Sequence, residues 1–147
     1  MKTISLKLSE VYALHDELNG IYQDETLVHE GILKSKLSLP TRYFLNQILK
    51  QATEHKVDID KARDGLILEL GVVDGDGKYS LSMLIDGFQN GVPTKVPNPN
   101  WGEFQKKMHE LFEESVEIKY KEFNIVEDLK DVSLDFDPVV LYKLAEN

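Results

Sequence analysis

The sequence predicts an α+β protein, in which a long amphipathic central helix packs with shorter helices and a small antiparallel β-sheet. Residues 39–71 place apolar side chains at alternating steps of three and four, which is the spacing of one helix face. Residues 116–121 instead alternate apolar and charged side chains, as a strand with one buried face does. Because the 147 residues show no internal repeat, we expect a single domain over residues 1–147.

The long helix carries one narrow apolar seam. A helix of roughly 30 residues extends about 45 Å at 1.5 Å per residue, so a seam of this length needs a partner. That partner is either two shorter helices of the same chain or a second copy, and we expect the protein to form homo-oligomers. A histidine in the seam would fix register or add pH sensitivity, unless it is simply hydrogen-bonded at the seam's edge. The predicted seam consists of Leu45, Ile48, Ala52, His55, Ile59, Ala62 and Leu66.

The N-terminal part is predicted to contain a short strand followed by a helix. Apolar residues at every second position indicate a strand over residues 4–8. Ser9 is the expected N-cap of a helix over residues 10–19, and Gly20 is its expected end. Residues 21–37 mix apolar and charged side chains, and fit either an ordered connector or a poorly formed piece of helix.

The middle of the chain is rich in turn and extended signals. The Asp-Gly-Asp-Gly run at residues 74–77 predicts a turn before a strand over residues 78–85. Three prolines make residues 92–100 an extended connector that cannot be a central strand. Asn100 with Glu103 resembles a capping box, which predicts the start of another helix that packs against the long one.

Two further predictions concern the C-terminal helix and a glycine inside the long helix. Asp137 as N-cap and Pro138 as first residue predict a short C-terminal helix. Gly65 lies inside the long helix, where glycine costs about 1 kcal/mol relative to alanine, so either a neighbour packs closely against it, which we favour, or the helix bends there.

Composition excludes several classes of function. The formal charge of −9, from 26 acidic and 17 basic residues, works against broad nucleic-acid binding, which needs clustered cations. Cysteine is absent, so disulfides and thiolate chemistry are excluded. The chain shows no apolar run of membrane-spanning length and no signal-peptide core. We expect a cytoplasmic protein without membrane contact.

Sequence motifs for catalysis are incomplete. Residues 74–77 resemble the front of a calcium loop, but the alignment puts Met83 where a bidentate glutamate is required. The pair His15-Asp16 could belong to a metal-dependent hydrolase, yet the other histidines show no matching ligand spacing. We therefore predict no catalytic residues, no metal ligands and no cofactor, with a metal-dependent hydrolase as the least favoured alternative.

One weak binding site is predicted at the start of the long helix. A helix N-terminus offers free N–H groups and partial positive charge to a phosphate or carboxylate. The residues that would complete such an anion site are Lys36, Arg42 and Tyr43. Most residues of this kind are only solvated caps, so both interpretations stay open.

The order of motifs resembles a loose family of small proteins of tailed bacteriophages and prophages. In that family an amphipathic helical hairpin is followed by a DG-rich turn, a further helix and a short tail. The segment from Met83 to Asn100 departs from this pattern. The matching pieces are Ala62-Arg63-Asp64-Gly65-Leu66 to Gly71, Asp76-Gly77-Lys78-Tyr79, Phe104 through Glu110-Leu111-Phe112-Glu113 to Val116-Glu117-Ile118, Asp131-Val132-Ser133-Leu134, and Val140-Leu141.

The resemblance implies a phage origin and leaves two functional hypotheses. The first is a non-enzymatic, self-associating protein that acts by stoichiometric binding, either inhibiting a host defence protein or sequestering its nucleotide signal. The second is a structural or assembly component of the virion. The expected partners are a second copy and either a host protein or a small anionic ligand.

Overall fold

The structure, a computed structural model, describes residues 1–23, 25–73, 75–130, 132, 134 and 136–147. It confirms an α+β fold with a long central helix. The chain divides into two compact units, residues 1–57 with 113–147 and residues 58–112. That all 147 residues form one domain stays a prediction. Asp74 of the predicted turn, and Asp131 and Ser133 of the segments compared above, lie outside the described residues.

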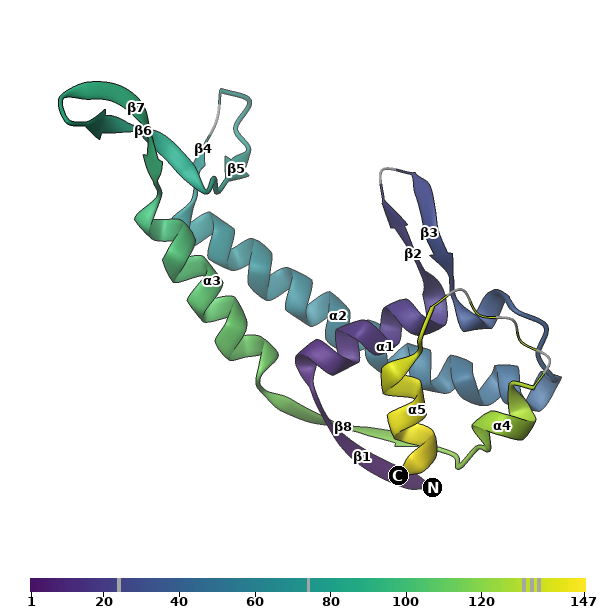
Figure 1. Cartoon of the computed structure of the whole chain (residues 1–147). Coiled ribbons are helices and arrows are strands. Elements are labelled where there is room, and N and C mark those ends of the chain that lie inside the picture. Colours follow the sequence, from purple (N-terminus) through teal and green to yellow (C-terminus); the bar gives the residue numbers. More distant parts are fainter. Residues whose placement is uncertain (24, 74, 131, 133, 135) are drawn as a thin grey trace. The chain divides into compact units, whose positions relative to one another are not determined.

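The first unit joins the two ends of the chain (Figure 1). Its strands β1 and β8 pair antiparallel, with Ile4 opposite Ile118. Its C-terminal Asn147 donates from Nδ2 to the carbonyl of Thr3, at 3.3 Å. The elements of this unit are β1 (Lys2–Lys7), α1 (Leu8–Asn19), β2 (Gly20–Gln23), β3 (Thr26–Glu30), the 3-10 turn η1 (Ile32–Lys34), the first part of α2 (Leu39–Leu70), β8 (Ser115–Tyr120), α4 (Ile125–Asp128) and α5 (Val139–Glu146).

A single hydrophobic core fills the first unit. The buried faces of α1, α2, β1, β8 and α5 contribute to it, and α1 packs directly on α5. Tyr120 contributes its ring to the core and donates its hydroxyl to the carbonyl of Leu144, at 2.7 Å. The core therefore joins segments that are far apart in sequence. Its largest fully buried side chains include Leu6, Leu14, Leu18, Ile32, Leu45, Ile48, Ile118, Leu141 and Leu144.

The predicted oligomer seam is largely occupied within one chain. Leu45, Ile48 and Ala52 belong to the core cluster, and Ile59 is also buried. Leu45, Ile48 and Ala52 thus pack within their own chain, and association of two copies along the seam stays a prediction. His55 and Leu66 are half-buried, and Ala62 is exposed.

The N-terminal predictions need two corrections. Helix α1 begins at Leu8 with Lys7 as N-cap instead of Ser9, because Glu10 Oε1 accepts the Lys7 N–H at 3.1 Å. Gly20–Gln23 and Thr26–Glu30 pair as the β2–β3 hairpin, and are neither a connector nor a helix. Its base is tight: Gly20 has a φ of 91°, and a side chain there would meet the backbone of His29 at 2.8 Å. The helix does end at Gly20, as predicted.

The second unit consists of the last part of α2 followed by two hairpins and a helix. Strands β4 and β5 form one antiparallel pair, and β6 and β7 form another. Helix α3 contacts α2, as predicted: Asn100 Nδ2 donates to the carbonyl of Leu70 at 3.1 Å, and Lys107 Nζ lies 3.8 Å from Glu69 Oε1. The added elements are β4 (Val72–Val73), β5 (Tyr79–Ser80), β6 (Leu84–Gln89), β7 (Val92–Pro97) and α3 (Pro99–Phe112).

Several predictions in the second unit also need correction. The strand expected over residues 78–85 is divided between β5 and the start of β6. Residues 92–97 form strand β7 and are not only a connector. A side chain at Gly65 would meet nothing within 4 Å, so no close packing explains that glycine.

Helix α3 starts two residues earlier than predicted. It begins at Pro99, and Asn98 Oδ1 accepts the Asn100 N–H at 3.0 Å. Asn98 therefore takes the capping position that the sequence assigned to Asn100. None of the helices in the described part of the chain is both long enough and apolar enough to cross a membrane.

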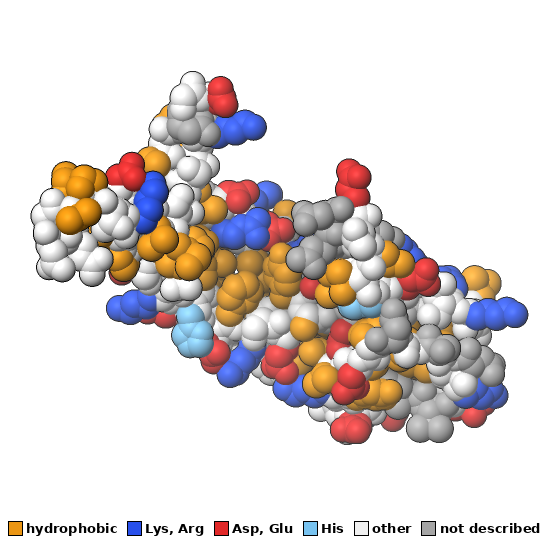
Figure 2. Space-filling model, turned by 45° about the horizontal axis from the view of Figure 1, so that its top comes forward, with side chains coloured by type: hydrophobic (Ala, Val, Ile, Leu, Met, Phe, Trp, Pro, Cys, Tyr) orange, Lys and Arg blue, Asp and Glu red, His pale blue; other side chains and the backbone are white. Residues whose placement is uncertain are grey.

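Burial differs sharply between the units. All the buried apolar side chains among the described residues lie in the first unit, except Ile59. Helix α3 has no buried residue, and the β6–β7 hairpin is largely exposed. Figure 2 shows hydrophobic side chains gathered at the surface of this hairpin.

Candidate functional site

A groove between α2 and β8 is the best candidate for a ligand site. Its volume is about 480 Å³, within the range typical of small-molecule pockets. Helix α2 contributes both aromatic and polar side chains, and β8 with the residue after it contributes two lysines. The lining residues are Met1, Tyr43, Phe44, Gln47, Lys50, Gln51, Glu54, Lys119, Tyr120 and Lys121.

Gln51 joins the helix to the strand beneath the groove. Its Nε2 donates to the carbonyl of Lys119 at 2.6 Å, and its Oε1 accepts the Lys119 N–H at 2.9 Å. The side-chain amide thus takes the place of a neighbouring strand at the outer edge of β8. Because those backbone groups are occupied, a peptide strand cannot pair with β8 at Lys119.

The groove is cationic in a chain whose net charge is −9. Lys50, Lys119 and Lys121 line it, and Glu54 is the only carboxylate among its lining residues. Among the residues that the structure describes, no carboxylate forms an ion pair with these three lysines. Their charges are therefore available to an anionic ligand.

Aromatic rings lie beside the lysines. The Tyr43 side chain is 58% exposed, and its ring meets that of Phe44 edge to face. The Lys121 ammonium lies 4.5 Å from the centroid of the Phe44 ring, a cation–π geometry. The groove thus combines a ring surface for stacking with cations for phosphate or carboxylate groups.

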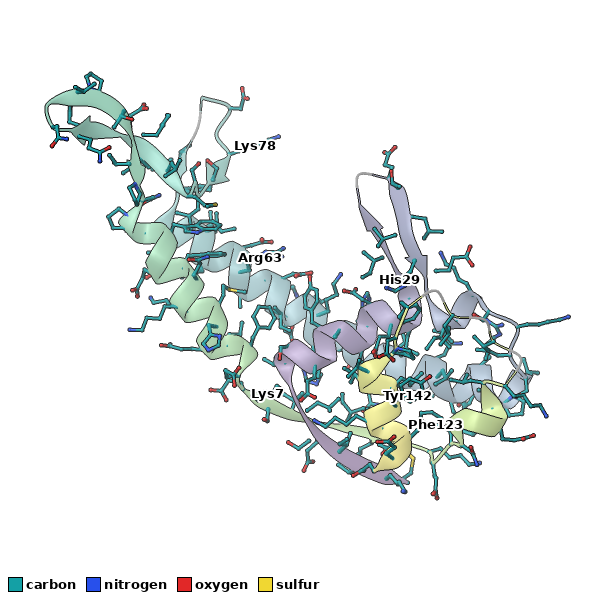
Figure 3. The ribbon with its side chains drawn as sticks, in the orientation of Figure 1. Lys7, His29, Arg63, Lys78, Phe123 and Tyr142 are labelled. Carbon is teal, nitrogen blue, oxygen red and sulfur yellow. The ribbon has the colours of Figure 1, made fainter. Side chains whose placement is uncertain are left out.

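A smaller cavity adjoins this groove and shares Phe44 and Lys121 with it. Its volume is about 180 Å³. Phe123, which is labelled in Figure 3, lies beyond the end of β8 and lines this cavity, with Asp128 also contributing. A ligand in the groove could extend one apolar group past Phe44.

The three residues predicted to form an anion site do not all line the same groove. Tyr43 lines the groove, whereas Arg42 and Lys36 do not. Arg42 Nη2 donates to the carbonyl of Ser35 at 2.7 Å, and Nη1 donates to the carbonyl of Leu33. Arg42 therefore fastens the segment before α2 to the helix, and the anion site of Lys36, Arg42 and Tyr43 stays a prediction. No sequence motif indicated Lys50, Lys119 or Lys121, which line the same groove as Tyr43.

A second cluster of polar residues lies between α1, β3 and the start of α5. It borders a cavity of about 470 Å³ lined by Asp16, Glu17, His29 and Asp137, among others. Figure 3 shows His29 near the base of the β2–β3 hairpin. Its ring stacks on Phe136, with centroids 4.0 Å apart. No motif in the sequence predicted a role for Glu17 or His29.

Glu17 caps helix α5. Its two carboxylate oxygens accept the backbone N–H groups of Val140 at 2.9 Å and Leu141 at 3.2 Å. Burial raises the pKa of Glu17 to about 7, although these two donors and nearby His29 lower it and Asp137 raises it further. The carboxylate thus satisfies two free N–H groups of a helix start, which is a structural task.

The alternative hydrolase site was predicted at His15 and Asp16. Their side chains contact each other, with Nδ1 and Oδ1 3.2 Å apart. In the described ranges, no three His, Asp or Glu side chains are grouped so that they could hold a metal ion.

No protein-family model, curated protein or solved structure matches this chain. Its function must therefore be inferred from its own geometry.

Proposed function

We propose that the protein binds a small anionic ligand with an aromatic ring, of the nucleotide class, in the groove between α2 and β8. One observation carries the proposal: three lysines that form no ion pair with any described carboxylate line a cavity of about 480 Å³ together with exposed Tyr43, in a chain of net charge −9. The mode of action is stoichiometric binding without chemical conversion.

The shape and chemistry of the groove favour a nucleotide over a peptide. Gln51 closes the backbone edge of β8 at Lys119, which removes the hydrogen bonds that an extended peptide would need. An aromatic base can stack on Tyr43, and base–aromatic stacking contributes about 1–3 kcal/mol. Phosphate oxygens can then contact Lys50 and Lys119 as point charges.

The resemblance to phage proteins makes a host nucleotide signal the preferred ligand. A protein that held such a signal in equal molar amounts would reduce its free concentration in an infected cell. This role requires a high affinity for the signal and a high copy number of the protein, but it requires no catalytic residue.

Calorimetric titration with ATP, inorganic triphosphate and adenosine tests the proposal. We expect ATP to bind, and we expect the double variant Lys50→Gln/Lys119→Gln to bind it at least about tenfold more weakly, equivalent to about 1.4 kcal/mol. Tyr43→Ala should weaken ATP binding while leaving triphosphate binding unchanged, because triphosphate has no ring.

The matched control is Lys61→Gln/Lys106→Gln. These two lysines are exposed in the second unit, so the control makes the same change in net charge away from the groove. Equal loss of ATP binding in both double variants would show that only overall charge matters, and would overturn the groove as the site. Absence of binding by all three probes would overturn the nucleotide class.

A native mass spectrum of the protein purified gently from host cells would identify the natural ligand. A bound species that carries phosphate supports the proposal, whereas a bound species without any anionic group contradicts it.

A further inference from the structure

We infer that the β6–β7 hairpin is a self-association surface, on which β6 pairs antiparallel with β6 of a second copy of this chain. This inference is independent of the ligand groove. It rests on the free edge of β6, on the exposed apolar side chains of the hairpin and on its neutral charge.

The first step concerns which backbone groups of the hairpin face outward. Asn90 and Gly91 both have positive φ, 53° and 77°, as a two-residue type I′ turn requires. Gln89 and Val92, which flank the turn, therefore form a hydrogen-bonded pair, and such pairs alternate along the hairpin. The outward-facing positions are then Leu84, Asp86 and Phe88 on β6, opposite Pro97, Lys95 and Pro93 on β7.

The two outer edges of the hairpin differ. On β7, two of the three outward positions are prolines, which have no N–H to donate, so this edge resists pairing. On β6, all three outward residues keep both N–H and C=O groups. In the part of the chain that the structure describes, no group is hydrogen-bonded to these outward backbone positions. Only the β6 edge can accept another strand.

The hairpin also exposes more apolar surface than an isolated pair of strands tolerates. Two-stranded hairpins are at best marginally stable alone, and a third or fourth strand adds stability. Phe88 is 73% exposed, and the other large apolar side chains of β6 and of the start of β7 are exposed as well. Pairing along β6 would cover part of the exposed apolar side chains of the hairpin and of the residue before it in each copy. These side chains are Met83, Leu84, Ile85, Phe88 and Val92.

Charge favours a second copy at this place. Two chains of net charge −9 repel one another over most of their surfaces. Between residues 83 and 97 the only charged side chains are Asp86 and Lys95, and they form an ion pair of 2.6 Å. Charged side chains on an edge normally prevent strands from pairing, but here Lys95 neutralises Asp86. The hairpin is thus a neutral surface on an acidic protein.

The test uses two proline variants that differ only in which edge they affect. Asp86→Pro removes the central N–H from the outer edge of β6, whereas Lys95→Pro removes the equivalent N–H from the β7 edge. Both lose the same ion pair, and both place proline at a position that makes no hydrogen bond within the hairpin. Mass would be measured by sedimentation equilibrium over a wide range of concentration.

We expect the unmodified chain and Lys95→Pro to form dimers, and Asp86→Pro to dissociate with a Kd at least about tenfold higher. Asp86→Pro lowers the negative charge and Lys95→Pro raises it, so charge repulsion alone predicts the opposite order. A monomeric unmodified chain, equal weakening by both variants, or a dimer that persists in Asp86→Pro would overturn the inference.

Amide hydrogen exchange provides a second measurement that does not depend on the variants. In the proposed dimer, the amides of Leu84, Asp86 and Phe88 are hydrogen-bonded to the second copy, and should become protected as concentration rises. The Lys95 amide on the opposite edge should exchange rapidly at every concentration. Protection that is independent of concentration, or shared by Lys95, would contradict pairing at β6.

Discussion

The two units of this protein bury apolar side chains in opposite ways. The first unit closes its core with segments from both ends of the chain, and Leu14, Leu18 and Leu141 are fully buried. The second unit contains hairpins between neighbouring segments, and Ile59 is the only buried apolar side chain in its described part. Long-range pairing completes a core, whereas local hairpins leave apolar faces that need a partner.

The free strand edges show the same difference. In the first unit, the side chain of Gln51 occupies the outer backbone groups of β8 at Lys119. In the second unit, the described residues provide no such group for the outer edge of β6. The first unit thus closes this edge within one chain and carries the proposed ligand groove, whereas the described part of the second unit leaves the outer edge of β6 open.

The largest expected effect tests the contrast in burial. Leu141→Ala should lower the free energy of unfolding by about 2–5 kcal/mol, because it removes a fully buried side chain from the core. Leu68→Ala on the exposed part of α2 should change it by no more than about 0.5 kcal/mol. Urea unfolding followed by circular dichroism measures both. Similar losses in the two variants would mean that the units are equally well packed.

The next prediction concerns the buried carboxylate of the first unit. Burial raises the pKa of Glu17 to about 7 from its ordinary value of 4.5. Between pH 4.5 and pH 7 the folded chain holds a proton on Glu17 that the unfolded chain has released. The contribution of Glu17 to folding stability is therefore fully present below pH 4.5 and is lost as pH rises through 7. We expect Glu17 to make the protein about 2 kcal/mol less stable at pH 8 than at pH 5.5.

Glu17→Gln should remove most of this pH dependence in urea unfolding at the two pH values. Asp86→Asn in the second unit is the matched control. The hydrogen bond from Lys95 and its charge lower the pKa of Asp86, so this carboxyl stays ionised throughout the window. An unchanged slope in Glu17→Gln would show that other groups control the pH dependence.

The smallest effect tests the closed edge of β8. Gln51→Ala removes both hydrogen bonds to Lys119 and should lower the free energy of unfolding by about 1–2 kcal/mol. Gln47→Ala on the exposed face one turn earlier should have almost no effect. In exchange experiments the Lys119 amide should lose protection only in Gln51→Ala. If it stays protected there, Gln51 is not what closes this edge.

Local patterns predicted the elements that depend on neighbouring residues. The alternating steps of three and four predicted α2 over nearly its full length, and the alternation after residue 115 predicted β8. The β2–β3 hairpin was missed, because its described turn residue with positive φ is Glu25, at 64°, instead of a glycine or asparagine. Its tight base at Gly20 and Gly31 depends on a close backbone approach that no local pattern reveals.

The candidate site was only partly visible in the sequence. Tyr43 was singled out for its place near a helix start, but Lys119 is 76 positions away in the numbering and carries no motif. The alternation of residues 116–121 indicates that Lys119 and Lys121 lie on the polar face of a strand. It does not indicate that this face meets α2, because the contact depends on the Gln51 amide and on the pairing of β8 with β1.

The fold class, the long helix, the strand over residues 116–121 and the acidic charge could all be predicted from the sequence, because spacing and composition are local or additive properties. The packing of Leu45, Ile48 and Ala52 within their own chain became visible only in the folded molecule. So did the lysines that line one groove with Tyr43, and the difference between the closed edge of β8 and the edge of β6, which is open among the described residues. These features depend on which distant segments meet, and the free energy of such contacts is set by burial and hydrogen bonding across the whole fold.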